Sequence, residues 1–287
     1  MRKFFAKLYD FSSSWTGTVV IVLLFIFFIA QAFVIPSGSM KNTLLIGDHL
    51  FVKKFAYGIA TPHIPWVEIP VWFDSDDDGH LVQGDRPKRG DIVVFRYPND
   101  PKIYYVKRNF AVGGDEVIFA PKTMYLRPHE GDEFIEKNYD KNDIVVLNGK
   151  KFVREPYKFK GIHYENRGDK DNFVGQNADT FTIALYYMQQ NKFAMSPAKI
   201  DELESIDGLP FNAFYFKVKD DNFFMVGDNR ENSNDSRFWG SVEYKFVVGQ
   251  PWFVYFSWDK DYKIRWERIG RLATTLENDE SLIYEQP

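Results

Sequence analysis

The sequence predicts a mainly β protein, in which a single N-terminal transmembrane helix precedes a β-rich core and a second, β-rich or irregular, inserted lobe. Three observations predict this fold class. One long apolar run occurs near the N-terminus. After Pro36, short alternating apolar runs recur between Gly, Pro, Asn and Asp, without the 3.6-residue period of an amphipathic helix. Aromatic residues make up 18% of the chain, and they favour strands and membrane interfaces.

The composition excludes several classes of protein. The 287 residues can form one large domain or two ordinary ones. The absence of cysteine excludes disulfides, thiol catalysis and Cys-ligated zinc, and we expect neither a metal nor a cofactor. A net charge of −4 and the lack of a basic stripe with interleaved aromatic residues argue against a nucleic-acid partner.

The apolar run predicts a transmembrane anchor over residues 15–35, after a short cytoplasmic N-terminus of residues 1–14. Residues 11–40 contain no charged side chain, and 15 of the 17 residues at positions 18–34 are apolar. About 20 such residues cross the hydrocarbon core at a rise of about 1.5 Å per residue. A buried core helix would be expected to have a polar face, and this run has none.

The flanking charges predict the orientation of this anchor. Arg2, Lys3 and Lys7 precede the run, whereas Lys41 alone follows it within about 15 residues. This bias places the N-terminus in the cytoplasm and the chain after Ile35 on the other side of the membrane.

A cleaved signal peptide is the alternative interpretation, because Ala30-Gln31-Ala32 supplies an A-x-A pattern. The apolar run is long, however, and Phe33-Val34-Ile35 continues it beyond that site. We therefore favour an uncleaved anchor.

The extramembrane part is expected to consist mainly of strands, with two short helices. The helices are expected at residues 179–190 and 196–204, each opening with a residue that can serve as an N-cap. The strands are expected where apolar residues alternate or cluster between turn residues, at 49–55, 91–97, 103–107, 116–119, 214–218, 223–226 and 246–256.

Composition divides this part into a core, a lobe and a tail. We expect the β core over residues 36–119 and 213–270. Residues 120–212 are polar and irregular and are expected to form the inserted second lobe. Residues 271–287 form an acidic C-terminal tail, which we expect to be frayed from residue 276 onward.

The core contains a hairpin-like insertion at residues 58–88, which carries several prolines. Its Asp-rich turn, residues 74–79, invites a calcium-loop interpretation but lacks the terminal Glu of an EF-hand, so a solvated turn is favoured. Its aromatic run, residues 64–73, either dips into the membrane interface or packs within the hairpin, and both interpretations remain open.

The first segment with chemical character lies directly after the apolar run and reads Ile35-Pro36-Ser37-Gly38-Ser39-Met40. Pro36 fixes φ and cannot extend a helix, so the chain leaves the run extended. Gly38 permits a sharp bend between two serines, and a serine in such a bend can present its hydroxyl. A plain turn serine is the alternative.

The second segment is a strand, Tyr104-Tyr105-Val106-Lys107-Arg108, in which Tyr105 and Lys107 share one face. Lysine titrates near about 10.4 in water. If Lys107 points inward among aromatic and β-branched neighbours, desolvation brings its pKa to about 7–8, where the neutral amine can act as a base. A lysine at a strand edge with its amine in solvent is the alternative.

The third segment follows an apolar strand and reads GDNRENSNDSRFWG from Gly227 to Gly240. Its Asn, Asp, Ser and Arg residues can form a buried hydrogen-bond network, because short polar side chains can satisfy one another in a tight loop. Aromatic runs on both sides favour a covered position over a solvated turn.

Together these segments resemble, in order and spacing, the sequence boxes of the bacterial type I signal peptidases, a Ser–Lys protease family. The resemblance covers residues 33–115 and 223–254, and it includes Gly47-Asp48, residues 54–58 and Arg89-Gly90-Asp91. It implies a β-rich catalytic core with a β-rich second lobe, in agreement with the fold class above. It also implies a membrane-bound serine endopeptidase that removes signal peptides from exported preproteins after small residues at −1 and −3.

The resemblance implies roles for the matching residues. Ser39 is expected to be the nucleophile, Lys107 the general base, and Ser37 the side-chain donor of an oxyanion hole whose second donor is the Ser39 backbone N–H. The residues expected to support the lysine, by orienting it or as an ion pair, are Ser233, Asp235 and Arg237. The residues expected to bind the substrate strand and its small side chains are Phe33, Ile35, Pro36, Met40, Leu44, Tyr105 and Val106.

The expected partners are preprotein signal peptides and the lipid bilayer, with the export machinery as a further candidate. The expected location is the bacterial cytoplasmic (inner) membrane, with the catalytic domain on its periplasmic or extracellular side. Two departures from the family pattern bear on loop shape: Asn42 replaces a frequent proline, and residues 111–115 read AVGGD where Gly-x-Pro-Gly-Asp is usual.

The sequence argues against three other functions. A Ser–His–Asp hydrolase is disfavoured, because the five histidines sit in no triad box and no G-x-S-x-G occurs. Ser196-Pro197-Ala198-Lys199 matches the S-x-x-K of penicillin-binding enzymes, but the S-D-N and K-T-G partners are missing. The main alternative is a catalytically inactive, membrane-anchored module of the same fold that binds signal sequences, and the presence of all expected catalytic side chains argues against it.

Overall fold

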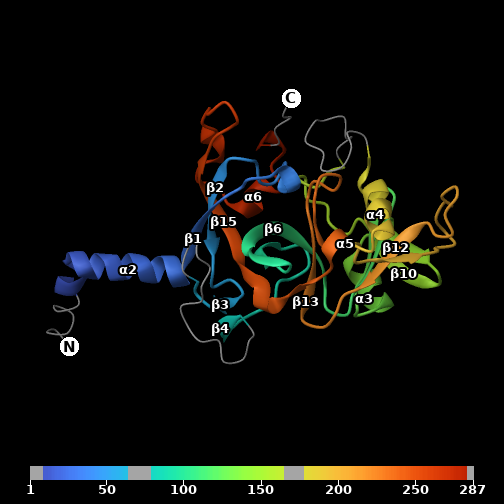
Figure 1. Ribbon diagram of the computed structural model, residues 1–287, viewed down its shortest axis with the longest axis horizontal. Helices are drawn as coiled ribbons and strands as arrows, with labels where there is room; N and C mark the ends of the chain where they lie inside the picture. The colour runs from blue at the N-terminus through green and yellow to red at the C-terminus, as the bar shows by residue number, and fades with distance from the viewer. Residues whose placement is uncertain (1–8, 64–78, 165–177, 283–287) are drawn as a thin grey trace.

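The computed structural model describes residues 9–63, 79–164 and 178–282 (Figure 1). Strands dominate this part of the chain, so the predicted mainly β class is confirmed. A seven-stranded sheet forms the core, and a six-stranded sheet forms the second lobe, on the right of Figure 1.

The core sheet is antiparallel throughout and joins strands that are far apart in the sequence. In spatial order its strands are β1 (Ala30–Val34), β2 (Asp48–Lys53), β15 (Val247–Ser257), β5 (Ile92–Tyr97), β6 (Asp100–Val112), β13 (Asn222–Val226) and β14 (Val242–Glu243). The strands predicted for 49–55, 91–97, 103–107, 223–226 and 246–256 are therefore confirmed.

The second lobe contains one more strand at each end than the sequence predicted. In spatial order its strands are β11 (Ser196–Ala198), β12 (Ala213–Lys217), β7 (Glu116–Ala120), β8 (Thr123–Arg127), β10 (Lys150–Arg154) and β9 (Ile144–Leu147). The strands β7 and β12 exist as predicted, but they pair with each other rather than with the core. The predicted limits at 119/120 and 212/213 are wrong by one strand, because a short apolar run does not reveal which sheet it joins.

Two helix predictions had different outcomes. Helix α4 (Thr180–Gln189) is confirmed, and the side chain of its N-cap residue Asp179 accepts a hydrogen bond from the Thr182 N–H at 2.7 Å. The helix predicted at 196–204 is wrong, since its first residues form the edge strand β11. Pro197 lacks an N–H, and an edge strand tolerates that loss.

Apart from α2 (Trp15–Phe28) and α4, the other helices that lie wholly within the described residues are short. They are α3 (Asp132–Asn138), α5 (Ser236–Trp239), α6 (Ala273–Leu276) and the 3-10 turns η1 (Gly38–Met40), η2 (Tyr244–Phe246), η3 (Trp266–Arg268) and η4 (Glu280–Leu282).

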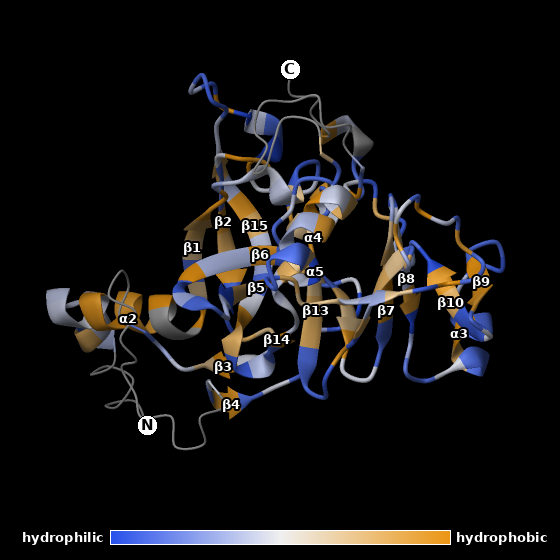
Figure 2. Cartoon of the chain, turned by 45° about the vertical axis from the view of Figure 1, so that its right-hand side comes forward, coloured by the Kyte–Doolittle hydropathy of each residue, from blue (hydrophilic) through white to orange (hydrophobic). Residues whose placement is uncertain are grey.

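The N-terminal apolar run folds as a helix followed by a strand. Helix α2 (Trp15–Phe28) extends away from the core sheet, and Figure 2 shows its apolar character. The predicted anchor is wrong at its C-terminal end, because Ala30–Val34 forms β1 and pairs with β2 from Ala30↔Lys53 to Val34↔His49. This pairing satisfies backbone groups that would otherwise lie open on β2, and an unbroken apolar run cannot distinguish it from a longer helix.

Helix length bears on the predicted anchor. Along the described ranges, no helix is both long enough and apolar enough to cross a membrane.

The insertion predicted at 58–88 contains an antiparallel strand pair, as a hairpin requires. Strand β3 (Gly58–Ala60) pairs with β4 (His80–Gln83). The aromatic run and nearly all of the Asp-rich turn lie in residues 64–78, outside the described residues, so the predictions for them remain untested.

The C-terminal tail is not frayed as far as residue 282. Leu276 is fully buried and Leu282 is 4% exposed, and both pack in the apolar cluster that contains Met40 and Leu44. The prediction of fraying is wrong here because two leucines of this acidic segment are buried in the core.

Candidate active site

The segment that carries Ser39 is held by backbone hydrogen bonds at Ile35 and by the buried side chain of Met40. The Ile35 N–H donates to the Asp48 carbonyl at 2.9 Å, and the Gly47 N–H donates to the Ile35 carbonyl at 3.0 Å. Met40 follows in the η1 turn and is 1% exposed. This anchoring leaves Ser39 half-buried on a short turn between two fixed points.

Lys107 lies on β6, directly beside Ser39. Its Nζ is 2.5 Å from the Ser39 Oγ and 5.2 Å from the ring centroid of Tyr105, which shares its face of the strand as predicted. Burial lowers the pKa of Lys107 to about 8, although Asp235 and Asp228 act to raise it. Near this pH the amine is neutral in a large fraction of molecules and can accept a proton.

Ser37 lies next to this pair. Its Oγ is 3.5 Å from the Ser39 Oγ, and its side chain is exposed. Among the described residues, no histidine is hydrogen-bonded to Ser39, so the arrangement consists of two hydroxyls and one amine.

The loop that begins at Gly227 supports the Ser39 turn through its backbone. The Asn229 N–H donates to the Ser39 carbonyl at 3.1 Å. A Cβ at Gly227 would lie 2.5 Å from the Ser39 carbonyl oxygen and 2.3 Å from the Ser233 Oγ, so only glycine fits. The predicted covered position of this loop is confirmed by the burial of Asp228, Asn229 and their neighbours.

Ser233 is buried beside Gly227, but its predicted contact with the lysine is not formed. Its Oγ makes no hydrogen bond to Lys107, and its hydroxyl lies near Asp235, where it helps to lower the pKa of that carboxyl. The structure therefore brings Ser233 to the site without a hydrogen bond that would orient Lys107.

The predicted ion pair between Asp235 and Arg237 is present and fully buried. The Arg237 Nε and Nη2 donate to the two carboxylate oxygens at 2.8 and 2.9 Å. Burial alone would raise the pKa of Asp235, but the neighbouring Arg237 guanidinium holds it below its usual value. Asp235 also accepts from the Gly227 N–H at 3.0 Å, so the pair fixes the loop against the site.

A second buried ion pair, which sequence reasoning missed, lies on the other face of β6. The Arg108 Nε and Nη2 donate to the two oxygens of Asp228, each at 2.7 Å. The Thr43 hydroxyl donates to the same carboxylate at 2.6 Å. The sequence signal was available, since Arg108 adjoins Lys107 in a buried strand and a buried guanidinium needs an acidic partner.

A third buried pair, also missed, holds the chain that leads from Ser39 into β2. The Arg268 Nη2 is 2.6 Å from the Asp48 Oδ2, and the Ser257 hydroxyl donates to the same carboxylate at 2.6 Å. The Arg268 Nη2 also donates to the Thr43 carbonyl at 3.0 Å.

The predicted substrate-binding residues divide between two clusters. One cluster contains Phe33, Ile35, Met40, Leu44 and Val106, of which Met40 and Leu44 are buried in the core. The Phe33 ring lies 5.1 Å from that of Tyr104. Tyr105 belongs to the other cluster, with Phe95 and Trp239, and Pro36 is exposed.

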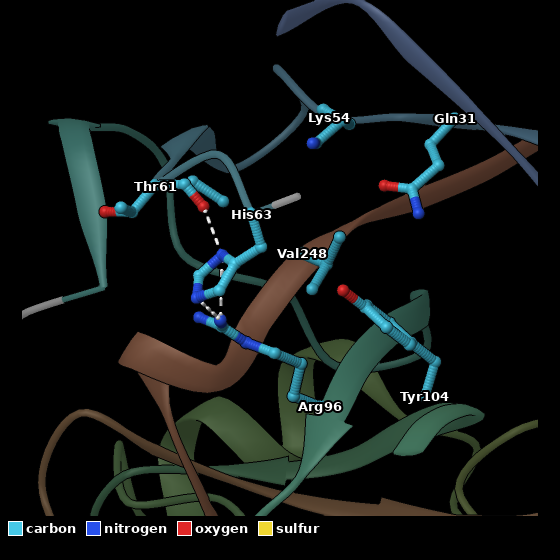
Figure 3. Close-up of a pocket in the computed structure, with 8 residues that line it drawn as sticks. Gln31, Lys54, Thr61, His63, Arg96, Tyr104 and Val248 are labelled. Atoms are coloured by element: carbon cyan, nitrogen blue, oxygen red, sulfur yellow. Dashed lines mark hydrogen bonds between the residues drawn. The ribbon is translucent and has the colours of Figure 1, made fainter. Parts of the chain in front are cut away.

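A small polar cavity lies near Tyr104 but is not lined by Ser39 or Lys107 (Figure 3). In it, His63 contacts the Thr61 carbonyl at 2.7 Å and the Arg96 guanidinium at 2.5 Å. Burial, with Arg96, lowers the pKa of His63 to about 4. His63 is therefore neutral near pH 7, and its cavity is lined by neither Ser39 nor Lys107.

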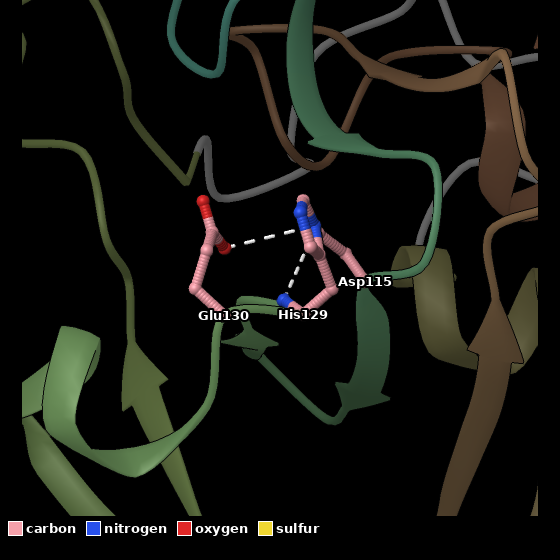
Figure 4. A group of neighbouring side chains, drawn as sticks. All are labelled: Asp115, His129 and Glu130. Carbon is pink, nitrogen blue, oxygen red and sulfur yellow. Dashed lines mark hydrogen bonds and ion pairs between the residues drawn. The ribbon is translucent and has the colours of Figure 1, made fainter.

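Asp115, His129 and Glu130 converge in a way that resembles a metal site (Figure 4). The Arg89 guanidinium occupies this cluster, with its Nη2 2.6 Å from Asp115 and 2.7 Å from Glu130. Because Arg89 already supplies the positive charge that a metal would bring, the cluster is an ion-pair junction between the core and the second lobe.

Comparison with known proteins identifies the family of the chain. Residues 8–258 match a family model described as signal peptidase, peptidase S26. Signal peptidase I of Helicobacter pylori is 49% identical over 294 residues, which cover 96% of each chain. Signal peptidase I of Pseudomonas fluorescens is 30% identical over 88% of this chain and 73% of its own, and that of Aquifex aeolicus is 30% identical over 83% and 81%. The chain therefore belongs to the S26 family of signal peptidases.

Proposed function

We propose that this serine endopeptidase removes N-terminal signal peptides from preproteins, with Ser39 as the nucleophile and Lys107 as the general base. One observation carries the assignment of roles: the Ser39 Oγ and the Lys107 Nζ are 2.5 Å apart, and Lys107 is only 4% exposed. A lysine in water keeps its proton up to about pH 10.4. Here burial lowers the pKa to about 8, so the neutral amine can take the hydroxyl proton.

The reaction would proceed in two halves. Lys107 takes the Ser39 proton as the hydroxyl oxygen attacks the scissile carbonyl, and the Ser39 N–H and the Ser37 hydroxyl stabilise the oxyanion. One such donor is worth about 2.7–4 kcal/mol. The Lys107 ammonium then gives its proton to the leaving amine as the C–N bond breaks. Water, deprotonated by the same amine, hydrolyses the acyl-enzyme.

Two open strand edges support the binding of an extended substrate. Strand β1 is an edge strand of the core sheet, and β13 pairs with β6 only from Arg108 onward. A peptide could therefore add to the open edge of β1, or to the part of β6 before Arg108 that β13 leaves unpaired, beside Ser39. Phe33, Ile35 and Val106 would line shallow pockets that accept small side chains at −1 and −3, with Met40 and Leu44 as the floor.

A membrane anchor is part of this proposal. The apolar side chains of α2, including Val22 and Leu24, are exposed rather than packed on the core. Such a surface is stable in a lipid environment or under another protein, which fits the bilayer and the export machinery as partners. The basic residues Arg2, Lys3 and Lys7 would keep the N-terminus in the cytoplasm of a bacterium and the catalytic domain outside its inner membrane.

The test is cleavage of a synthetic Ala-x-Ala peptide by the full chain in detergent. We expect wild-type cleavage after the second alanine, and loss of it in Ser39→Ala and in Lys107→Ala. Lys102→Ala is the matched control, since Lys102 is an exposed lysine of the same strand. Equal activity in all four proteins would refute the assignment of Ser39 and Lys107. Peptide binding without cleavage in the wild type would favour the inactive-module alternative.

A further inference from the structure

The C-terminal segment Ala273–Leu282, which contains α6, lies beyond the region that matches the family model, since that match ends at residue 258. It nevertheless contributes to the apolar cluster that supports the Ser39 turn. Leu276 and Leu282 pack in the same buried cluster as Met40, the residue that follows Ser39. The segment is thus in contact with the core that supports the nucleophile.

Glu277 is a buried carboxylate of this segment. It is 7% exposed, and its Oε2 accepts a hydrogen bond from the Arg108 Nη1 at 2.8 Å. The same Nη1 donates to the Gly90 carbonyl at 2.7 Å, and the opposite edge of the guanidinium is held by Asp228. Glu277 therefore completes the set of acceptors around a guanidinium that is almost completely enclosed.

The contacts continue from Arg108 to the nucleophile turn. Asp228 accepts from the Thr43 hydroxyl at 2.6 Å, and the Thr43 N–H donates to the Met40 carbonyl at 3.0 Å. An unbroken series of buried polar contacts thus leads from Glu277 through Arg108, Asp228 and Thr43 to the residue after Ser39.

The same segment holds the turn by a second route. The Leu282 carbonyl accepts from the Arg268 Nη1 at 3.3 Å, and the Arg268 Nη2 donates to the Thr43 carbonyl at 3.0 Å. Two buried arginines therefore bind Thr43, one through Asp228 and one directly, and the C-terminal segment contacts both.

We propose that Glu277 is a positioning residue of the active site, which acts through Arg108 and Asp228 on the turn that carries Ser39. The proposal rests on the proposed function, because its main effect is on peptide cleavage. Glu277 touches no reacting atom. By fixing the Arg108 side chain it keeps Asp228 and Thr43 in place, and a displacement of about 1 Å at reacting atoms can cost about 10²-fold in rate.

The test is Glu277→Gln in the full chain, assayed on the Ala-x-Ala peptide in detergent. The amide keeps the shape of the side chain but removes the charge that holds the guanidinium. We expect kcat to fall by about tenfold or more while KM stays within about twofold. Glu267→Gln is the matched control, since Glu267 is an exposed carboxylate of the same C-terminal region. A kcat for Glu277→Gln within about twofold of the control would overturn the proposal.

A double-mutant cycle tests the route of the effect. Thr43→Val removes the hydrogen bond from the Thr43 hydroxyl to Asp228, which is the last side-chain link of the series, and preserves side-chain volume. If Glu277 acts through Asp228 and Thr43, the two substitutions are non-additive, and Glu277→Gln costs less kcat in the Thr43→Val background. Additive losses would overturn the route. Thermal unfolding gives the folded fraction of each variant, and kcat is corrected for that fraction. A purely structural role would lower the melting temperature and leave the corrected kcat unchanged.

Failure of the proposed function is distinguishable from failure of this inference. If the wild type does not cut the peptide, the proposed function fails, and the titration of the Lys107 amine by NMR decides the inference without any substrate. A titration midpoint that differs between the wild type and Glu277→Gln supports a role for Glu277 in arranging the site. Identical midpoints overturn it.

Discussion

Lys107 and Arg108 are neighbours on β6 that face opposite sides of the strand, and both are buried, at 4% and 1% exposure. Arg108 has two carboxylates in direct contact and keeps its charge. Lys107 has no carboxylate within salt-bridge distance among the described residues, and its hydrogen-bond partner is a neutral hydroxyl. Equal burial therefore gives opposite outcomes: the paired cation is structural, and the unpaired one can release its proton.

The largest expected effect comes from giving the Lys107 position a permanent charge. In Lys107→Arg the guanidinium stays protonated at any accessible pH and cannot accept the Ser39 proton. We expect kcat/KM on the peptide to fall by about 10³-fold or more, since general bases contribute about 10²–10⁴-fold and the larger side chain also displaces the hydroxyl. Lys102→Arg, on the exposed part of the strand, should keep full activity. Retention of activity by Lys107→Arg would contradict the role of a neutral amine.

A second large effect is expected on the opposite face, where Asp228→Asn removes a charge from the pair with Arg108. Breaking a buried ion pair costs about 3–5 kcal/mol when it leaves a charge uncompensated. Glu277 still contacts Arg108 after this substitution, so the lower end of that range applies. We expect a loss of this size in the free energy of unfolding, measured by chemical denaturation. The control is Asp221→Asn, whose partner Arg86 lies on the surface, and exposed pairs contribute about 0–1 kcal/mol. Equal losses in the two variants would show that burial does not distinguish the pairs.

The pH dependence of peptide cleavage gives a smaller expected effect and a further test of the comparison. Because Lys107 must be neutral to act, we expect kcat/KM to rise about tenfold per pH unit below an apparent pKa of about 8 and to level off above it. The folded pKa lies below that of unfolded lysine, so the unfolded state binds more protons between about pH 8 and pH 10.4. Stability contributed by this group therefore rises with pH across that window, by about 3 kcal/mol in total.

The comparison of wild type with Lys107→Met isolates this contribution. The wild type should gain stability relative to the variant as pH rises from 8 to about 10.4. A constant difference between the two unfolding free energies across that window would mean that the amine of the folded enzyme titrates like a free one.

The sequence was informative where chemistry is concentrated in short segments. Ser39, Lys107 and the Asp235–Arg237 pair lie in compact boxes, and the structure brings them together. Sequence reasoning could not find Glu277, because its partner Arg108 is 169 residues away and nothing local marks the contact. Long-range pairs of this kind depend on the complete topology.

The errors in the fold have a related cause. Residues 30–34 continue an apolar run, and only the presence of β2 beside them makes a strand the better structure. Strands β7 and β12 were recognised as strands, but their membership of the second sheet depends on partners that local patterns do not specify. Ser196 has the features of an N-cap, yet the free edge of β12 recruits it into a strand.

The junction between α2 and β1 also fixes a length of chain between the helix and the active-site segment. Strand β1 follows the helix after a single residue, and a strand advances about 3.3 Å per residue. Its five residues therefore span roughly 17 Å of extended chain between the end of the helix and the segment that leads to Ser39. If a preprotein binds with its own apolar stretch beside α2, the proposed function requires a similar length of extended chain between that stretch and its cleavage site. A shorter or longer spacing would leave the cleavage site away from the Ser39 hydroxyl.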